Sequence, residues 1–323
     1  MRLCTLISSY EDSTSPYKDI DPYPDPARWM PEHTWSRALL TRANAEATID
    51  RLAEQGVDVF VNLCDGAPEE DLAGVEVIEH LVRRGLAFTG ADARFYAMSR
   101  EAFKQAYDAG GVPSPGHAFV SDVAGAEHAA GRLRLPLFVK PLSGYASVGI
   151  EKDSRVDTRE ALGERVGRTV ARFGGALIEE FIEGREFTLL VSEPPPGQAR
   201  PRVHTPVEVR FPANEAFKHF ELKWTGFQGM DTVPVTDAEL VARLTELGER
   251  TFQVTGARGY CRCDVRMNAR GELFMLDCNA NPGVFYPPES FGSADFILSL
   301  EPDGHHAFLT GIIDGARRAA GRR

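Results

Sequence analysis

The sequence of 323 residues has few cysteines, a deficit of positive charge and no long apolar run. Its five cysteines are too few, and odd in number, for a disulfide framework, which favours a reduced, cytoplasmic setting. Lys and Arg number 36 against 47 Asp and Glu, so the basic surface typical of nucleic-acid binding is missing. No stretch approaches the roughly 20 apolar residues of a membrane span, and the start lacks a cleavage signal. We therefore expect a cytoplasmic protein that binds neither nucleic acid nor a membrane.

The first hundred residues alternate between strand-like and helix-like patterns. Residues 2–8 and 57–63 are short apolar runs rich in β-branched side chains, and residues 41–54 and 75–84 have helical periodicity. This order predicts a parallel α/β lobe. Residues 11–35, rich in Pro, Asp and aromatic side chains, fit neither period; they are either a binding loop at the end of the first strand or a surface elaboration.

The remaining chain predicts two further lobes. We expect an N-terminal lobe over residues 1–105, a central lobe over 106–195 and a C-terminal lobe over 196–323. The Pro-rich stretch 193–197 is either a hairpin turn or a boundary between lobes. Near the end, two apolar strands are separated by Asn268, Ala269, Arg270 and Gly271, which are turn residues, so the strands should pair as a hairpin.

That hairpin carries the most informative polar residues. Because side chains alternate along a strand, Arg262 and Asp264 share one face, and so do Asp277 and Asn279. If the two polar faces coincide, carboxylate and amide oxygens converge, as Mg²⁺ requires. Cys261, Cys263 and Cys278 then point into the core as packing residues. The alternative is a solvated hairpin face on which Arg262 pairs with the acids, but the apolar residues 273–276 argue for burial.

Two other segments have side chains suited to a nucleotide. Lys140 ends a strand and precedes a glycine-containing loop that runs to Ile150, an arrangement able to bind phosphate, although an ordinary hairpin loop would look similar. The strand 177–187 carries acids that could accept hydrogen bonds from an amine or from ribose hydroxyls, or that could simply be exposed.

In order and spacing these three pieces, VKPLSGYASVGI, LIEEFIEGREFT and RCDVRMNARGELFMLDCNANPG, resemble the ATP-grasp superfamily, and most of all its D-alanine–D-alanine ligase branch. The resemblance covers about residues 85 to 290. It implies an α/β fold, α+β in the ATP-binding lobes, with ATP held between two sheets. It also implies a reaction in which a small-molecule carboxylate takes the γ-phosphoryl group, and an amine then captures the acyl phosphate. A homodimer is an expectation from the resemblance alone.

The resemblance also implies roles for individual residues. Nucleotide-binding roles fall on Lys140 and Ser147 for the phosphates, Glu179, Glu180, Phe181 and Ile182 for adenine, Glu186 for ribose and Lys223 for the γ-phosphate. Metal-binding roles fall on Asp264, Asp277 and Asn279, for two Mg²⁺ ions or for Mn²⁺. Arg262 and Lys223 are the expected catalytic residues, Arg262 because an always-charged guanidinium suits the oxyanion of the tetrahedral intermediate.

The sequence departs from the branch at several of these places. Asp277 stands where these ligases usually carry Glu, Ala146 replaces a serine and Trp224 replaces a tyrosine. The Ser-Leu pair that receives the second D-alanine is missing after Gly283, and Ala102 falls where a lysine is usual, with Lys104 two residues later.

The sequence thus retains the nucleotide and metal apparatus of the branch, while the departures alter both amino-acid pockets. We therefore expect an amide-forming ligase whose amino-acid-like substrates are not two D-alanines. The alternatives are an authentic D-alanine–D-alanine ligase, a non-catalytic ATP-binding protein, and an enzyme that passes the activated acyl group to a thiol. His305 and His306, which lack nearby ligands at metal spacing, are predicted to lie on the surface.

Overall fold

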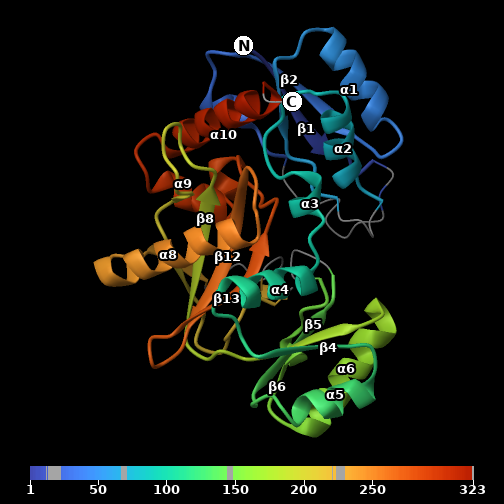
Figure 1. The fold of residues 1–323 in the computed structure, drawn as a ribbon, viewed down its shortest axis with the longest axis vertical. Coiled ribbons are helices and arrows are strands. Elements are labelled where there is room, and N and C mark those ends of the chain that lie inside the picture. Colours follow the sequence, from blue (N-terminus) through green and yellow to red (C-terminus); the bar gives the residue numbers. More distant parts are fainter. Residues whose placement is uncertain are drawn as a thin grey trace.

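The computed structural model describes residues 1–11, 13, 23–66, 71–143, 148–219, 221–222 and 230–321. These residues form three sheets, one in each of three lobes arranged along the long axis of the molecule (Figure 1). The predicted α/β organisation is confirmed. No helix among the described residues has both the length and the apolar character needed to cross a membrane.

The N-terminal lobe is built on a parallel sheet, as the sequence predicts. The strand order is β2 (Thr34–Leu40), β1 (Arg2–Ser8), β3 (Val59–Asn62), with α1 (Ala45–Glu54) and α2 (Val75–Arg83) packed on its core. β2, which pairs in parallel with β1, is not predicted by the sequence pattern. Most of β2 is exposed at the sheet edge, so its sequence lacks the apolar run that reveals β1 and β3.

The central lobe is a small antiparallel sheet covered by two helices. Its strand order is β4 (His117–Val120), β7 (Ala176–Glu180), β5 (Leu137–Pro141), β6 (Arg155–Val156). The helices α5 (Val123–Ala130) and α6 (Arg159–Phe173) bury their apolar faces on it in one core, at the end of the molecule opposite the N-terminal lobe (Figure 1).

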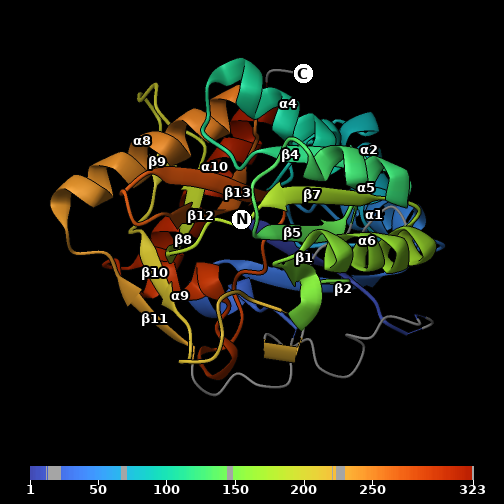
Figure 2. The same ribbon diagram turned by 90° about the horizontal axis from the view of Figure 1, so that it is seen from below.

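The large sheet joins the two ends of the molecule. Figure 2 shows its strands in the order β13 (Leu273–Asn279), β12 (Tyr260–Met267), β8 (Arg185–Ser192), β10 (Val207–Arg210), β11 (Asp231–Pro234), and β9 (Arg202–Val203) pairs with β8. Side chains of α4 (Arg100–Gly110) and α8 (Ala238–Val254) pack in the core on one face, and those of α9 (Ser293–Ser299) and α10 (Gly304–Ala320) pack in the core on the other. The short helical turns are η1 (Pro26–Trp29), α3 (Ala93–Tyr96), η2 (Lys152–Ser154) and η3 (Pro288–Ser290).

Local sequence explains where the two helices on the α4–α8 face begin and end. The side chains of Ser99 and Asp237 cap the first turns of α4 and α8 by accepting hydrogen bonds from the backbone N–H groups of Ala102 and Leu240. Gly111, with φ of 65°, ends α4 in the left-handed conformation that glycine adopts without strain.

The stretch after β8 is a hairpin connection, because β9 pairs antiparallel with β8. Residues 193–197 therefore lie in a hairpin connection, as one of their two interpretations predicts. The predicted lobe boundaries stay predictions; β8, which they assign to the central lobe, is hydrogen-bonded between β10 and β12 of the large sheet.

Candidate active site

The hairpin of β12 and β13 presents the predicted polar face. Arg262 lies opposite Asn279, and Asp264 lies opposite Asp277, so all four side chains start from the same face of the sheet. Cys263 lies opposite Cys278 and faces the other way, into the core with Cys261, and the three thiols are free. The two polar faces therefore coincide, and the predicted burial of the cysteines in the core is confirmed.

Asp264 is held by three neighbours on this face. Its carboxylate accepts hydrogen bonds from the Thr188 hydroxyl and from Arg262 Nη2, each at 3.1 Å, and Lys218 Nζ lies 3.9 Å away. Burial acts to raise the pKa of Asp264, but the charges of Arg262 and Lys218 and the Thr188 hydroxyl outweigh it and hold the pKa below its usual value. Asp264 is therefore charged near neutral pH, as its predicted role as a metal ligand requires.

Asp277 lies where two lobes meet. Lys140 Nζ, from the end of β5, is 3.2 Å from Asp277 Oδ2, and Arg100 Nε, from α4, is 3.7 Å from Oδ1. Desolvation acts to raise the pKa of Asp277, but the charges of Lys140 and Arg100 lower it to about 2. Asn279 completes the set, and its Oδ1 accepts a hydrogen bond from the backbone of Asn281 at 2.9 Å.

Two buried lysines share one buried glutamate beside this carboxylate. Lys140 Nζ is 2.8 Å from Glu179 Oε2, and Lys104 contacts Glu179 Oε1, with all three side chains at most 5% exposed. Burial disfavours the charged forms of Glu179 and Lys140, but their neighbours outweigh it. The two lysines lower the pKa of Glu179, and Asp277 and Glu179 raise the pKa of Lys140. Lys104, rather than position 102, thus supplies a second lysine next to Lys140.

The residues predicted to frame adenine lie at the end of β7 and directly after it. Glu180 accepts hydrogen bonds at the surface from Nε and Nη2 of Arg134, with Nη2–Oε2 at 2.8 Å. The Phe181 ring packs against Phe138 with centroids 5.9 Å apart, and the Arg266 guanidinium lies 4.7 Å from its centroid. The Ile182 carbonyl accepts from Arg266 Nη1 at 2.9 Å.

Arg266 also fixes the residue predicted to hold ribose. Its Nε and Nη2 donate to Glu186 Oε2 at 3.1 and 2.9 Å, and Lys218 Nζ is 3.1 Å from Glu186 Oε1. Glu186 is only 5% exposed. Arg266 therefore joins the adenine segment, the ribose residue and the polar face of β12.

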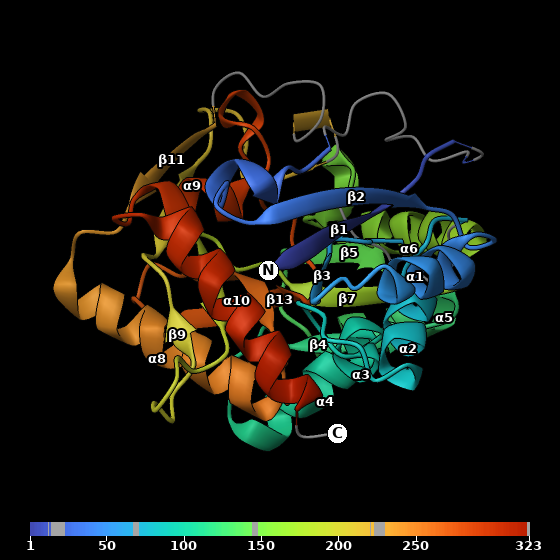
Figure 3. The ribbon, with the colours of Figure 1, turned by 90° about the horizontal axis from the view of Figure 1, so that it is seen from above.

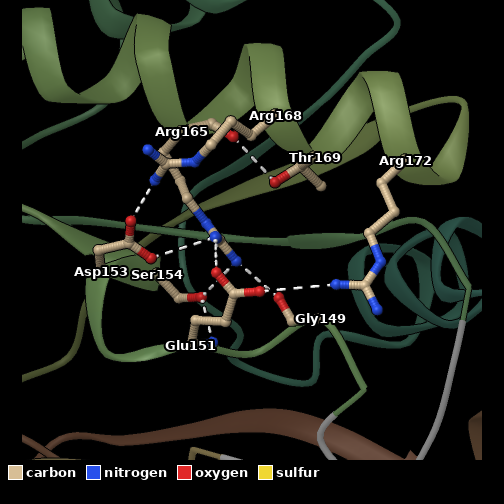
Figure 4. A network of polar contacts seen from close by, with 8 residues as sticks. All are labelled: Gly149, Glu151, Asp153, Ser154, Arg165, Arg168, Thr169 and Arg172. Atoms are coloured by element: carbon tan, nitrogen blue, oxygen red, sulfur yellow. Dashed lines mark hydrogen bonds and ion pairs between the residues drawn. The ribbon is translucent and has the colours of Figure 1, made fainter.

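The segment that follows the predicted phosphate-binding loop is anchored to α6. Figure 4 shows Arg165 at the centre of this network, where it donates to the Gly149 carbonyl and Glu151 Oε2, both at 2.7 Å, and to the Ser154 hydroxyl at 2.9 Å. On the other side of the loop, Arg100 Nη1 donates to the Pro141 carbonyl at 2.6 Å and to the Ser143 carbonyl at 3.1 Å. Ser147 and Lys223, which the sequence also predicts as nucleotide ligands, lie outside the described residues, as do Ala146 and Trp224.

Arg100, Thr188, Lys218 and Arg266 also lie at the site but were not predicted from the sequence. The alternation that revealed Arg262 and Asp264 extends to Arg266, so that residue had a signal. The other three come from separate elements, and only the tertiary structure brings them to the site. The histidine prediction is wrong for His305, which is 4% exposed because it hydrogen-bonds to the buried Asp295.

The donor set on the hairpin fits Mg²⁺ or Mn²⁺. Two carboxylates and an amide oxygen are hard ligands, and no thiol or imidazole among the described residues lies on their face of the hairpin. Lys140 and Lys104 add the positive charge that nucleotide phosphates need. Arg262 has a buried Nε–H without a hydrogen-bond partner among the described residues, so its guanidinium has an unused donor at the site.

Comparisons with known proteins agree with this geometry. A family model described as D-ala D-ala ligase C-terminus matches residues 117–286, more than half of the chain. The chain belongs to the D-alanine–D-alanine ligase family. Among its relatives in this family, a D-alanine–D-alanine ligase of Nitratidesulfovibrio vulgaris (strain DP4) is 31% identical over 70% of each chain. Another, from Ectopseudomonas mendocina (strain ymp), is 29% identical over 73% of this chain and 72% of that protein.

Solved structures show the same fold over the whole chain. The D-alanine–D-alanine ligase of Bacillus anthracis matches with a TM-score of 0.71 and 17% identity, covering 100% of this chain and 99% of the other. The VanG D-Ala:D-Ser ligase of Enterococcus faecalis matches with a TM-score of 0.72 and 15% identity over 98% and 99%. The predicted ATP-grasp fold with three lobes is confirmed, and so is the predicted class of enzyme, an ADP-forming ATP-grasp ligase.

Proposed function

We propose that the protein joins the carboxylate of one amino-acid-like substrate to the amine of another, using ATP and releasing ADP and phosphate. The observation that carries this proposal is the 3.2 Å contact between Lys140 Nζ and Asp277 Oδ2. It places a predicted phosphate-binding cation from the central sheet directly beside a predicted metal ligand from the large sheet. ATP with two Mg²⁺ ions would lie between these two sheets.

The residues divide the chemistry between two steps. In the first, a substrate carboxylate oxygen bonds to the γ-phosphorus and ADP leaves, giving an acyl phosphate; Asp264, Asp277 and Asn279 would hold the Mg²⁺ that neutralises phosphate charge. In the second, the amine attacks the acyl carbon, loses a proton, and phosphate departs. Arg262 would act in this second step, because its unused Nε–H would stabilise the oxyanion that forms on the acyl carbon.

The substrate pair is the finer part of the proposal. The relatives named above are D-alanine–D-alanine ligases, and this supports two D-alanines better than the different pair that the sequence departures suggest. D-Alanine with D-alanine is therefore the first pair to test. The expected cytoplasmic location and the homodimer stay predictions.

A coupled assay of ADP release tests the function directly. Purified protein with Mg²⁺ and ATP is given D-alanine, then pools of other D- and L-amino acids, and the products are identified by mass. Arg262→Ala should leave ATP binding unchanged and lower kcat by about 10²–10³-fold, because one donor to the oxyanion is lost. Arg270→Ala, an exposed arginine in the turn of the same hairpin, is the matched control and should keep full activity.

Three results would contradict the proposal in different ways. Loss of ATP binding in Arg262→Ala would assign that residue a structural role. ATP binding by the wild type without ADP release in any pool would favour the non-catalytic alternative. Activity that needs a thiol acceptor would keep the acyl transfer and exclude amide formation.

A further inference from the structure

A segment of the N-terminal lobe is docked on α10 and on the loop that follows the predicted metal site. Residues 23–33, which we call the docking segment, precede β2 and lie beside α9 and α10 in Figure 3. The backbone N–H of Asp25 donates to the Phe285 carbonyl at 2.7 Å. The Trp29 ring stacks on His305 with centroids 3.9 Å apart and planes 9° apart, and Glu32 pairs with His306 at 3.2 Å. Parts of the chain more than 250 residues apart thus form one contact.

The loop that Asp25 contacts donates backbone hydrogen bonds to a single buried carboxylate. Residues 283–292, the exit loop, follow the turn after Asn279. Asp295, which is fully buried, accepts from the backbone N–H of Phe285 at 2.7 Å, of Gly292 at 3.3 Å and of Tyr286 at 3.4 Å. It also pairs with His305 Nε2 at 3.1 Å. One buried acid therefore ties both ends of the exit loop to the ring on which Trp29 stacks.

The exit loop adopts a backbone conformation that needs this support. Phe285 has φ of 69°, a left-handed conformation that is strained for any residue other than glycine. Such a residue persists only where its surroundings hold it. Here the hydrogen bonds on both sides of Phe285, from Asp25 to its carbonyl and from its N–H to Asp295, supply that restraint.

The exit loop starts directly after the turn that follows Asn279, a predicted metal ligand. Asn281 donates its backbone N–H to the ligand oxygen of Asn279 and its side-chain Nδ2 to the Cys64 carbonyl of the N-terminal lobe, both at 2.9 Å. A Cβ atom at Gly283 would lie 2.6 Å from the Tyr286 ring, so this ring packs closely on the start of the exit loop. Lys140 and Glu179, by contrast, approach from the central sheet.

We propose that Trp29, His305 and Asp295 are positioning residues that fix the exit loop and thereby set the fit of the amino-acid-like substrates, as distinct from ATP. This inference rests on the proposed function. None of the three residues touches the four polar residues of the hairpin face in the described structure; they act through the backbone of the exit loop. Shifts of about 1 Å in a positioning element can change turnover by about 10²-fold.

The decisive variants are Trp29→Ala, which removes the stacked ring, and Trp29→Phe, which keeps one. Arg28→Ala, the exposed neighbour in the same helical turn, is the matched control. In Trp29→Ala we expect KM for the amino-acid substrates to rise about tenfold or more, with KM for ATP unchanged, and Trp29→Phe to restore most of the loss. Hydrogen exchange should be faster at residues 283–292 and unchanged in β12 and β13.

The two readouts separate this inference from the proposed function. If the wild type proves to have no ligase activity, the proposed function fails, while hydrogen exchange still tests the link between Trp29 and the exit loop. Unchanged exchange and unchanged substrate KM in folded Trp29→Ala would overturn the inference. An equal rise in both KM values with a lower Tm would also overturn it, because it would show a merely structural role. If Trp29→Ala does not fold, His305→Gln, which retains a donor to Asp295 but loses the ring, replaces it.

Discussion

Replacing Arg266 with methionine should destabilise the protein by leaving a buried charge without its main partner. Arg266 and Glu186 have side chains only 3% and 6% exposed, and the guanidinium also donates to the carbonyls of Ile182 and Ala216. Methionine fills much of the same volume without any donor. Among the described residues, Lys218 would remain as the cation on Glu186. Breaking one side of a buried ion pair costs about 3–5 kcal/mol, so the free energy of unfolding should fall by that amount.

Urea unfolding at pH 7, followed by circular dichroism, measures this loss. Arg270→Met is the control, because Arg270 is 74% exposed in the turn of the same hairpin and should change the free energy of unfolding by less than about 0.5 kcal/mol. A double-mutant cycle then locates the cost. If the loss comes from the unpaired carboxylate, Arg266→Met combined with Glu186→Gln should be at least about 1 kcal/mol more stable than the sum of the single effects.

Two results would refute this reasoning. A loss below about 1 kcal/mol in Arg266→Met would mean that water or Lys218 replaces the guanidinium without cost. Strict additivity in the cycle would mean that Arg266 stabilises the protein through the Ile182 and Ala216 carbonyls and its packing on Phe181, and that the ion pair with Glu186 contributes nothing.

Two further predictions concern other charges. Thr188→Val keeps the shape but removes the hydroxyl that donates to Asp264, so the Mg²⁺ concentration for half-maximal ADP release should rise about two- to tenfold, the equivalent of one hydrogen bond. An unchanged Mg²⁺ dependence would exclude this role. Burial acts to raise the pKa of Glu301, but hydrogen bonds from His204 and the Thr205 backbone lower it to about 2 from 4.5. Because the pKa is lower in the folded state, the stability from Glu301 is present above pH 4.5 and lost toward pH 2, so Glu301→Gln should be destabilising in thermal unfolding at pH 6 and nearly neutral at pH 2.

Local patterns predicted the parts of the site that lie on one hairpin. Alternation along β12 and β13 is a property of a few consecutive residues, so Arg262 could be grouped with Asp264, and Asp277 with Asn279, without knowing the fold. That the two pairs share one face depends on the register, which the structure supplies. The same holds for β1 and β3, whose apolar runs are buried on both faces of the sheet.

Long-range contacts could not be predicted in this way. Arg100 reaches Asp277 from a helix 177 residues earlier in the chain, and nothing in the pattern of α4 marks it. His305 looked like a surface residue because its partner Asp295 lies in a separate helix and carries no motif. β2 could not be predicted from apolar pattern, because an exposed edge strand needs few apolar residues.

An irregularity in the hairpin explains how an apolar strand can end in a predicted metal ligand. Strict alternation would put Met275 and Asp277 on the same face, yet Met275 is fully buried in the core and Asp277 lies opposite Asp264. Asp264 pairs with Asp277, but the next residue, Val265, pairs with Met275. Leu276 is therefore an extra residue on β13, with no partner on β12. A bulge of this kind redirects the side chains on either side of it. It lets Leu273 and Met275 complete the core beside Cys263 while Asp277, only two residues later, turns toward Lys140, and this places a carboxylate between the two lobes that would bind ATP.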